Sequence, residues 1–487
     1  MSGNVGSISR SFALCAIFYA AFATAAAAQP AVTISPGSGP PTAAVTVGGS
    51  GFGASEVVDI YFDTTDLAVA ASNGRGRFKG IVLTIPADAL PGTHWITAVE
   101  RRNDHAAQQA FTVATGWAEF GFGPRNRRYN RYENVLGTAN VAALDTLWSF
   151  ATGSFVHSSP AVANGIVYVG SFDKNVYALD ATTGTKLWSF ATGDFVYSSP
   201  AVANGIVYVG SFDKNVYALD AATGAMLWFF TTGTFVESSP AVVNGVVYVG
   251  SEDASVYALD ATTGAKLWSF ATGNAVASSP AVANGVVYVG SFDDNVYALD
   301  AATGAKLWSF ATGSSVLSSP AVANGVVYFG SIDGNIYALD AATGVKLWSF
   351  ATGSGVYSSP AVANGVVYVG SGDDNIYALD AATGAMLWSS ATGSAVSSSP
   401  AVANGVVYVG SDDDNIYALD AATGTKLWSS ATGSAVFSSP AVANGVVYFG
   451  SGDHNIYAAS GAAPPVAGAA PPRLSELHAN LSLAPAD

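Results

Sequence analysis

Aspartate and asparagine recur together along most of the chain, and oxygen ligands of this kind suit a hard cation such as Ca²⁺. The triplet Asp-x-Asn occurs seven times from Asp173 onward, and Ser255 replaces the asparagine in one further copy. The densest stretch is SDDDN at residues 411–415, but it lacks the downstream ligand spacing of a calcium loop. We therefore interpret each triplet as a turn in which Asp and Asn bond to nearby backbone, and we expect no metal site.

Other residues that carry chemistry are few or poorly spaced. The five histidines show no metal-ligand spacing, and the chain has neither a phosphate loop nor a nucleophile elbow. Glu237 and Glu252 are the only glutamates of the repeated region. His157 and His454 are expected near the two ends of that region, as surface residues. We predict no catalytic residues and no bound cofactor.

The first 28 residues predict a secretory signal peptide. Arg10 precedes the apolar stretch FALCAIFYAAFATAAAA, and the small residues Ala26 to Ala28 suit cleavage. A membrane anchor is the alternative, but the alanine-rich end of the stretch favours removal. The one cysteine, Cys15, follows Leu14 rather than a small residue, which disfavours a lipid anchor. The mature chain is then free of disulfides and expected in the periplasm or outside the cell.

Composition narrows the class of protein further. Half of the residues are hydrophobic, 53 are glycine, and the formal net charge is −16. Such a composition is typical of a strand-rich globular protein with many turns. The negative charge disfavours nucleic acid as a partner, and no other long apolar segment predicts a membrane span.

Residues 31–115 predict a β-sandwich, because short strand-like segments alternate with Gly, Pro and Asn-Gly turns. The segments are 44–52, 57–65, 77–86, 93–100 and 109–115. Residues 116–142 form a connector that contains Arg125, Arg127, Arg128 and Arg131. This basic cluster is either a binding patch or, as we expect, an ordered lead-in whose arginines pair with acidic groups of the next domain.

The segment 143–458 is a repeat array with a period of 40 residues. Prolines recur from Pro160 to Pro440 and tryptophans from Trp148 to Trp428 at this spacing. Each unit predicts four strands, which begin in the first unit with Val156–Val162. The proline removes a backbone donor and so belongs on a sheet edge, which suits a strand beside a central channel. Four strands in 40 residues are typical of one propeller blade; a solenoid of stacked strands is the alternative.

The ends of the array favour a closed ring. It begins with a fourth-type strand at 144–152 and ends after a third-type strand at 455–460. The leading strand can therefore complete the last of eight blades and leave no unpaired sheet edge. The remaining residues, 459–487, are rich in Ala and Pro and are expected to form a mobile tail.

The turn before each tryptophan strand carries a family resemblance. The stretch ALDATTGTKLW at 178–188 recurs at 218–228 and five more times, and it resembles the docking motif of propeller repeats of the pyrroloquinoline-quinone (PQQ) type. The resemblance implies that tryptophans pack between blades while Asp and Gly shape the turn. The residues concerned include Asp180, Gly184, Trp188, Asp220, Gly224 and Trp228. In the sandwich, GGSGFGASEVV and LPGTHWITAV resemble bacterial immunoglobulin-like domains.

The same resemblance raises the question of catalysis. Quinoprotein dehydrogenases of this family hold PQQ with a calcium ion, and they use a catalytic aspartate, calcium ligands, usually a disulfide of adjacent cysteines, and insertions that build a pocket. This chain lacks the cysteines, and its blades carry no insertions. The family also includes a non-catalytic propeller of the outer-membrane β-barrel assembly machinery, which acts as a scaffold.

Comparison of the eight units shows where they differ. The Asn-Gly turns hardly vary, whereas the residue before each SSP and the residue before each Asp-x-Asn change from unit to unit. In a four-stranded meander both variable places open on one face. Aromatic residues gather there in the first three units, at Phe155, Phe172, Phe195, Tyr197, Phe212 and Phe235. Acidic residues gather in the last three, at Asp373, Asp374, Asp412, Asp413, Asp414 and Asp453.

We therefore predict an all-β protein, an immunoglobulin-like sandwich followed by an eight-bladed propeller, that acts as a monomeric, non-catalytic binding or scaffold protein. A protein or a glycan would bind the variable face, unless its aromatics only fill gaps between blades and its acids only solubilise the rim. The residues assigned to the face are His157, Phe172, Tyr197, Phe212, Glu237, Phe292, Tyr357, Asp412, Phe437 and His454. A PQQ-dependent dehydrogenase with calcium is the alternative.

Overall fold

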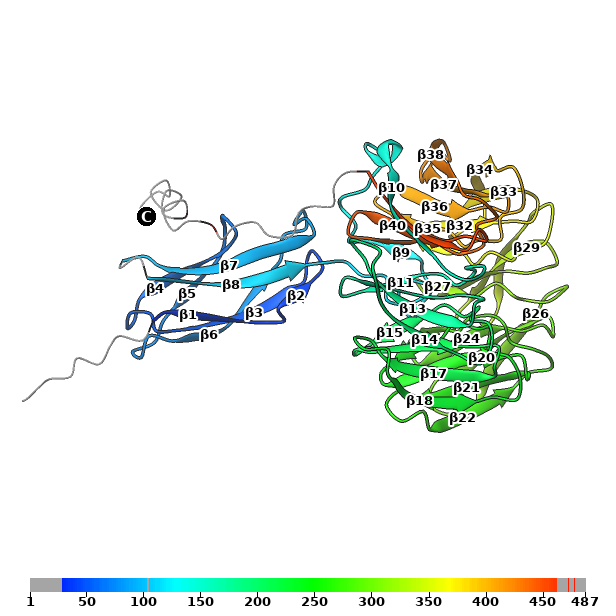
Figure 1. Ribbon diagram of the computed structural model, residues 1–487, viewed down its shortest axis with the longest axis horizontal. Helices are drawn as coiled ribbons and strands as arrows, with labels where there is room; N and C mark the ends of the chain where they lie inside the picture. Colours follow the sequence, from blue (N-terminus) through cyan, green and yellow to red (C-terminus); the bar gives the residue numbers. More distant parts are fainter. Residues whose placement is uncertain (1–28, 103–104, 462–471, 473–476, 478–487) are drawn as a thin grey trace, which may run out of the picture.

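The computed structural model describes residues 29–102, 105–461, 472 and 477. These residues form a small β-sandwich followed by a ring of β-sheets (Figure 1). The all-β propeller predicted from the repeat is confirmed. The predicted signal peptide, residues 1–28, lies outside the described residues, as does most of the predicted tail.

The sandwich packs a three-stranded sheet, in the order β1-β3-β6, against a five-stranded sheet, in the order β2-β8-β7-β4-β5. Its strands are β1 (Ala31–Ser35), β2 (Ser38–Gly39), β3 (Ala44–Ser50), β4 (Val57–Phe62), β5 (Thr65–Ala71), β6 (Phe78–Thr84), β7 (Gly92–Glu100) and β8 (Ala106–Val113). The sequence missed β1, β2 and β5. Strand β5 is largely exposed, so it lacks the alternation of buried and exposed positions that marks a half-buried strand.

The repeat array forms eight sheets, each a meander of four antiparallel strands; strand β9 (Tyr129–Asn130) of the connector adds to one of them. The first strands are β11 (Ala161–Ala163), β15 (Ala201–Ala203), β19 (Ala241–Val243), β23 (Ala281–Ala283), β27 (Ala321–Ala323), β31 (Ala361–Ala363), β35 (Ala401–Ala403) and β39 (Ala441–Ala443). The second strands are β12 (Ile166–Gly170), β16 (Ile206–Gly210), β20 (Val246–Ser251), β24 (Val286–Gly290), β28 (Val326–Gly330), β32 (Val366–Gly370), β36 (Val406–Gly410) and β40 (Val446–Gly450).

The outer half of each blade completes the meander. The third strands are β13 (Asn175–Asp180), β17 (Asn215–Asp220), β21 (Ser255–Asp260), β25 (Asn295–Asp300), β29 (Asn335–Asp340), β33 (Asn375–Asp380), β37 (Asn415–Asp420) and β41 (Asn455–Ser460). The fourth strands are β14 (Lys186–Ala191), β18 (Met226–Thr231), β22 (Lys266–Ala271), β26 (Lys306–Ala311), β30 (Lys346–Ala351), β34 (Met386–Ala391), β38 (Lys426–Ala431) and β10 (Asp145–Ala151). A short 3₁₀ helix, η1 (Val141–Ala143), precedes β10.

The first strand of each blade is shorter than the sequence predicts. In the first blade β11 covers only Ala161–Ala163, not residues 156–162. Pro160 offers no backbone donor, and the Ser158 hydroxyl takes part in the pairing instead, since its Oγ accepts the N–H of Gly170 at 2.9 Å. The SSP segments therefore run toward the axis as extended chain with their hydroxyls engaged.

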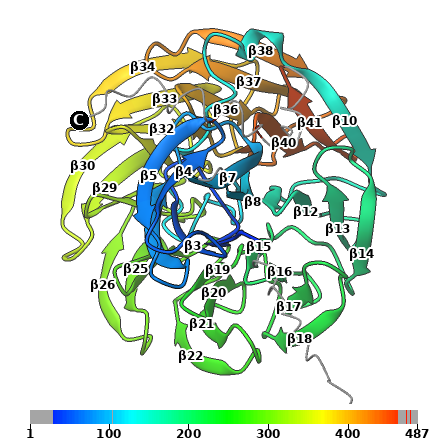
Figure 2. The same ribbon diagram turned by 90° about the vertical axis from the view of Figure 1, so that its left-hand side faces the viewer.

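Pairing between the two ends of the array closes the ring. Strand β10 lies antiparallel to β41, with Ser149 opposite Tyr457 and Ala151 opposite Asn455. Figure 2 shows β10, in cyan, beside β41, in red. The strand that precedes the first complete blade thus becomes the outer strand of the last one, as the offset of the repeats predicted.

A circle of serines joins the blades beside the axis. Each serine donates its backbone N–H to the Oγ of the equivalent serine in the next blade, at 2.9–3.0 Å. The last of these bonds runs from Ser439 back to Ser159. The members of this serine circle are Ser159, Ser199, Ser239, Ser279, Ser319, Ser359, Ser399 and Ser439.

Tryptophans join the blades farther out. Trp188 donates its indole N–H to the carbonyl of Ala221 in the next blade at 3.0 Å. Gly224, with φ +72°, lies so close that a Cβ would come within 2.7 Å of this indole ring. Asp220 accepts the backbone N–H groups of the same turn. The same junction recurs around the ring, and its residues include the motif positions Asp180, Gly184, Trp188, Asp220, Gly224 and Trp228.

The connector winds once around the axis and satisfies the inner edge of every blade. Successive hydrogen-bond acceptors of the connector contact successive blades. In each of the first seven blades, one acceptor binds the N–H of the central valine of the first strand, beginning with Val162 and ending with Val402. These acceptors are the carbonyls of Trp117, Ala118, Pro124, Arg125, Arg127 and Arg128 and a carboxylate oxygen of Glu119. In the eighth blade Asn130 donates to the carbonyl of Val442 at 2.8 Å. Unpaired inner edges are thereby removed.

The predicted ion pairs of the connector arginines are wrong. Among the described residues, no acidic group lies within ion-pairing distance of Arg125, Arg127, Arg128 or Arg131. Several of these residues contribute their backbone carbonyls to the blades instead. The prediction rested on the positive charge of the arginine side chains. The inner edges of the blades instead bind the backbone carbonyls of Arg125, Arg127 and Arg128, which accept hydrogen bonds.

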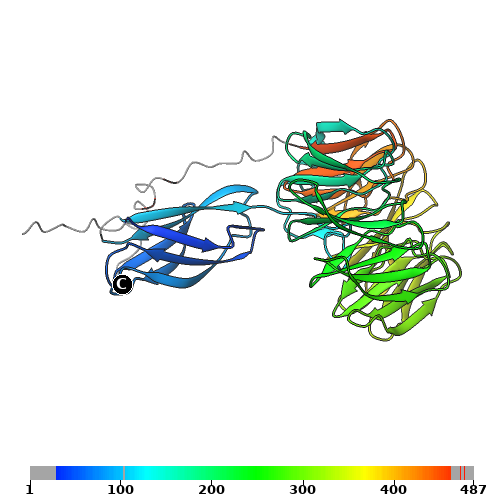
Figure 3. The same cartoon turned by 60° about the horizontal axis from the view of Figure 1, so that its bottom comes forward.

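The sandwich lies beside one face of the propeller (Figure 3), and its hydrogen bonds identify this face as the one with the Asn-Gly turns. Thr115, which ends the sandwich, exchanges hydrogen bonds with Asn444 in the Asn-Gly turn of the last blade. Asn134 of the connector donates to the carbonyl of Ala89 at 2.9 Å. The turns with variable residues open at the opposite end, which the sandwich leaves uncovered.

The C-terminal segment is not wholly detached. Leu477 is fully buried against Tyr61 and Val99 of the sandwich, and Gln108 donates to the carbonyl of Pro472 at 3.0 Å. These contacts involve two residues of the predicted tail, and the mobility expected for residues 459–487 stays a prediction. The apolar surface beside Tyr61 gives Leu477 a place to bury its side chain.

Substitution of Trp148 should destabilise the propeller through its seam. The Trp148 indole is 8% exposed and bonds Ala181, and Trp→Ala changes at buried sites cost about 3–5 kcal/mol. Trp148→Ala should therefore lower the melting temperature clearly. Leu147→Ala is the matched control, because Leu147 is on the same strand but 37% exposed. Equal melting temperatures for the two variants would contradict this role of Trp148.

Candidate functional site

The variable residues of the eight blades meet in one cavity on the axis, with a volume of about 540 Å³. The residue before SSP lines it in every blade: His157, Tyr197, Glu237, Ala277, Leu317, Tyr357, Ser397 and Phe437. Phe172 and Phe212 add to its wall. A position that varies freely along the chain therefore becomes a single asymmetric surface once the ring closes.

The two variable positions of one blade lie next to each other. The ring centroids of His157 and Phe172 are 4.7 Å apart. The Glu252 carboxyl lies near enough to Glu237 to raise the pKa of Glu237 further, after burial. Variation at one place in a blade therefore changes the surroundings of the other.

One side of the cavity is an aromatic wall. Phe437 and His157 lie 4.6 Å apart between centroids, across the seam of the ring. His157 then meets Tyr197 edge to face at 5.4 Å, and Tyr197 stacks on Phe212 at 6.2 Å and 14°. Such contacts hold large apolar rings in fixed orientations, so the wall is preorganised.

Acidic groups approach the same space from other blades. Burial raises the pKa of Glu237 to about 7, and the neighbouring Glu252 adds to the shift. Burial also raises the pKa of Asp412, although Ser397 donates a hydrogen bond to its Oδ2 at 3.3 Å. Burial raises the pKa of Tyr197 well above its usual value, and the charges of Glu237 and Asp412 act in the same direction. The Tyr197 hydroxyl therefore lies within the field of both carboxyls.

His157 is neutral at physiological pH. Burial lowers the pKa of its imidazole to about 4, and its Nδ1 is buried without a partner among the described residues. It thus contributes an aromatic face rather than a positive charge to the cavity.

The connector supplies the floor of the cavity. Phe120 lines it, together with the serine circle. The Arg128 guanidinium lies 3.7 Å from the centroid of the Phe120 ring and donates to the Phe120 carbonyl at 3.1 Å. Arg128 is fully buried, and its Nε and Nη2 have no partner among the described residues. Burial lowers the pKa of Arg128.

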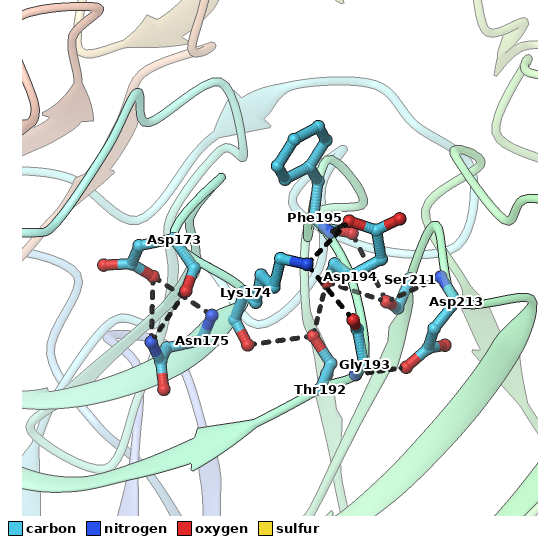
Figure 4. Close-up of polar contacts among 9 residues, drawn as sticks. All are labelled: Asp173, Lys174, Asn175, Thr192, Gly193, Asp194, Phe195, Ser211 and Asp213. Carbon is cyan, nitrogen blue, oxygen red and sulfur yellow. Dashed lines mark hydrogen bonds and ion pairs between the residues drawn. The ribbon is translucent and has the colours of Figure 1, made fainter.

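The Asp-x-Asn triplets are turns, as the sequence predicted, and each joins two blades. Asp213 accepts the N–H of Gly193 from the preceding blade at 2.6 Å and the Tyr217 hydroxyl at 2.7 Å. Figure 4 shows this contact beside the equivalent turn at Asp173, where Asn175 closes the turn. Because the first carboxylate of each triplet is used in this way, it is not an open cation ligand.

The acidic side of the variable face is therefore smaller than the sequence suggests. Asp373, Asp413 and Asp453 occupy turn positions of this kind. Although burial acts to raise it, the bonds from Tyr417, Gly393 and Asn415 hold the pKa of Asp413 below its usual value. Asp374 and Asp414 remain exposed at the rim.

The structure brings together most of the residues assigned to the face from sequence, but not all of them. Phe292 and Asp412 do not line the cavity. His454 lies at the rim, with its ring 5.1 Å from that of Phe155. Phe120 and the serine circle were not predicted from the sequence. The signal for the serine circle was the Ser-Ser pair that precedes the proline in all eight units.

A second cavity, of about 670 Å³, lies between the sandwich and the first and last blades. Its lining includes Gly39, Gly92, Thr115, Asn164 and Asn444 and contains no titratable side chain. The axial cavity is therefore the stronger candidate for binding.

Family models match most of the repeat array. A model described as "Outer membrane protein assembly factor BamB" matches residues 174–275, 252–357 and 333–463, which together exceed half of the chain. A model of the β-propeller domain of "Glucose/ethanol/alcohol dehydrogenase" matches residues 117–198. No curated protein matches the sequence.

Solved structures of two kinds share the fold. BamB from Moraxella catarrhalis is 21% identical, with a TM-score of 0.56 over 65% of this chain and 99% of that one. A europium-containing methanol dehydrogenase is 16% identical, with a TM-score of 0.63 over 71% and 98%. The quinohemoprotein alcohol dehydrogenase from Comamonas testosteroni is 19% identical, with a TM-score of 0.64 over 73% and 82%. At these identities the likeness shows the fold alone.

Glu119 in the connector should make the stability of the propeller depend on pH. Burial raises the pKa of this carboxyl from 4.5 to about 8, and its Oε2 has no partner among the described residues. The folded state therefore keeps a proton that the unfolded chain releases between these values, so stability falls as pH rises from 4.5 to 8. Glu119→Gln should remove this loss.

Urea unfolding of both proteins at pH 4.5, 6 and 8 measures the effect. The stability advantage of Glu119→Gln over wild type should grow with pH, because the amide has no proton to lose. The amide oxygen can still accept the Val242 N–H. Asp414→Asn, at an exposed position, controls for the change in net charge. An advantage that stays constant with pH would contradict the assignment.

Proposed function

The chain belongs to the family described as outer membrane protein assembly factor BamB, and from this premise we propose that it is a non-catalytic scaffold that binds a protein partner outside the cytoplasm. The partner docks on the variable face of the propeller. The observation that carries the proposal is that the sandwich and connector cover the opposite face, while the variable face presents large aromatic side chains to solvent.

The exposed aromatic residues of this surface are Tyr357, at 45%, and three phenylalanines that we term the aromatic rim: Phe155, Phe195 and Phe235. Their exposed fractions are 44%, 39% and 38%. Phe195 stacks on Phe172 at 5.1 Å and 8°, and Phe235 stacks on Phe212 at 4.9 Å and 10°. The rim is thus continuous with the aromatic wall of the cavity, and its rings are held before any partner arrives. Preorganised aromatic anchors of this kind are typical of binding hot spots.

Charges around the rim are arranged unevenly. Lys174 lies 3.4 Å from Asp194 and 5.8 Å from the centroid of Phe195, and it also reaches the carbonyl of Gly193 (Figure 4). Its charge is therefore partly neutralised beside the aromatic rings. Across the face, Asp374 and Asp414 are exposed. A protein surface with apolar and basic regions would complement this pattern.

The dehydrogenase alternative requires the cavity to hold PQQ and a calcium ion, and the residues present do not fit them. PQQ is a quinone that carries several carboxylates, whereas Glu237 is the one charged residue of the lining and no lysine or arginine joins it. Among the described residues no group of three or more His, Cys, Asp or Glu side chains could hold a metal ion. The serine circle and the aromatic wall offer no acid or base in its place.

The proposed location outside the cytoplasm rests on the predicted signal peptide at residues 1–28. Within the described part of the chain, no helix is long and apolar enough to cross a membrane. A glycan partner remains the second possibility from the sequence, and its recognition would also use the exposed rings.

Substitution of the aromatic rim should abolish partner binding without unfolding the protein. We expect the triple variant Phe155→Ser, Phe195→Ser, Phe235→Ser to retain less than about a tenth of wild-type binding, because it removes the buried apolar anchors of the interface. Proteins that copurify from an envelope extract are identified by quantitative mass spectrometry, and the leading one is then purified and titrated.

The matched control changes equally exposed apolar residues elsewhere: Leu187→Ser, Leu227→Ser, Leu267→Ser on the outer strands, where the exposed fractions are 49%, 50% and 53%. This variant should bind like wild type. Equal loss in both variants, or in neither, would remove the rim from consideration. Dye reduction by the protein after addition of PQQ and calcium would instead support the dehydrogenase.

A further inference from the structure

The axial cavity combines aromatic faces with the carboxyl of Glu237, and no balancing lysine or arginine of the described residues lines it. Its lining holds Phe172, Tyr197, Phe212, Tyr357 and Phe437, and neither lysine nor arginine lines it. Arg128 lies on the Phe120 ring of the floor and is fully buried. The faces of aromatic rings carry partial negative charge, so the rings and the carboxyls favour the same sign of ligand.

The acidic groups converge from three blades. Glu237, with Glu252 behind it, belongs to the third blade, Asp412 to the seventh and Tyr197 to the second. Tyr197 lies within the field of both Glu237 and Asp412, although these carboxyls come from distant parts of the ring. A ligand placed against the Tyr197 ring therefore enters the field of both carboxyls.

Two buried polar atoms, on Asp412 and on His157, have no hydrogen-bond partner among the described residues. Oδ1 of Asp412 is buried and has no partner among the described residues, while Oδ2 accepts a bond from Ser397. Nδ1 of His157, whose ring contacts Tyr197, is likewise buried without a partner. Buried acceptors without donors are costly, so a ligand that brings N–H groups and positive charge would stabilise the site.

The same features disfavour other small ligands. An anion would meet the Glu237 carboxyl, and no lysine or arginine among the described residues lines the cavity to offset it. A neutral sugar would stack on the rings but would leave the excess negative charge uncompensated. The volume of about 540 Å³ falls in the range of small-molecule pockets.

We propose that the axial cavity binds an organic ammonium group, held against the faces of Tyr197 and its neighbouring rings and paired with the carboxyl of Glu237. Asp412, which lies outside the lining, adds to the negative field at Tyr197. Cation–π contacts and charge-assisted hydrogen bonds supply the affinity. A free alkylamine and a lysine side chain of a docked protein offer the same chemistry. The inference does not depend on the proposed scaffold function, because a free amine can bind whether or not a protein docks on the rim.

Calorimetric titration with butylammonium tests the proposal, with butan-1-ol as the neutral isostere. Butylammonium should bind with a Kd below about 1 mM, and butan-1-ol at least tenfold more weakly. Titration with a short peptide that contains one lysine distinguishes the sources: tighter binding of the peptide than of butylammonium assigns the cavity to a protein side chain, and weaker binding assigns it to a free amine.

Variants with conserved shape locate the site. Glu237→Gln and Asp412→Asn should each weaken butylammonium binding at least fivefold, and Tyr197→Leu should do so through loss of the ring. Leu187→Ala on an outer strand and Glu119→Gln in the connector are controls that should leave it unchanged. If Tyr197→Leu does not fold, the two carboxyl variants carry the test alone, since their melting curves show whether they are intact.

Proton release gives a second readout that a structural role would not produce. An ammonium group favours ionised Glu237 over the protonated form, whereas burial and the neighbouring Glu252 oppose ionisation; Tyr197 is the other titratable group in the field of Glu237. Binding at pH 7 should therefore release protons, seen as a dependence of the binding heat on buffer, and Glu237→Gln should abolish it. Absence of saturable binding up to 10 mM (about ten times the expected limit), equal binding of butan-1-ol, or binding of glucose but not butylammonium would overturn the proposal.

Discussion

The pairing of β10 with β41 is the interaction on which the rest of the structure depends. Each blade is a separate sheet with four strands from the repeat array. Without closure, the last blade would lack its outer strand and would expose the edge of β41. Because the array begins with an outer strand and ends without one, the two ends complete a single blade. Closure turns eight inner edges toward one axis, where the connector can satisfy all of them in one circuit. The serine circle depends on closure as well, since its last bond crosses the seam.

Closure also explains how nearly identical blades can build an asymmetric site. The residues that hold the ring together hardly vary between units: the serines, the tryptophans with their facing glycines, and the Asn-Gly turns. The two positions that vary in each blade lie at the mouth of the axis, side by side within the blade. Aromatic residues occupy them in the first two blades and acids in the third and seventh. The scaffold thus separates stability from binding, because a change at the mouth leaves the junctions between blades untouched.

Much of this was predictable from sequence. The fixed spacing of Pro160 and Trp148 with their copies predicted the blades, and the offset of the ends predicted the seam. Variation before SSP predicted which face holds the cavity. The path of the connector was not predictable, since its backbone carbonyls do the bonding and any residue supplies a carbonyl. The same reasoning erred on Arg128, which stacks on Phe120 rather than pairing with an acid, and it missed the place that Leu477 finds on the sandwich.

Hydrogen–deuterium exchange of the seam tests the closed ring most directly. In a closed ring β41 is flanked by β40 and β10, as β29 is flanked by β28 and β30 in the middle of the array. The amides of residues 455–460 should therefore be protected as strongly as those of residues 335–340, and β10 should share that protection. Rapid exchange in β10 and in the β41 amides that face it, with β29 still protected, would show an open array and contradict the account.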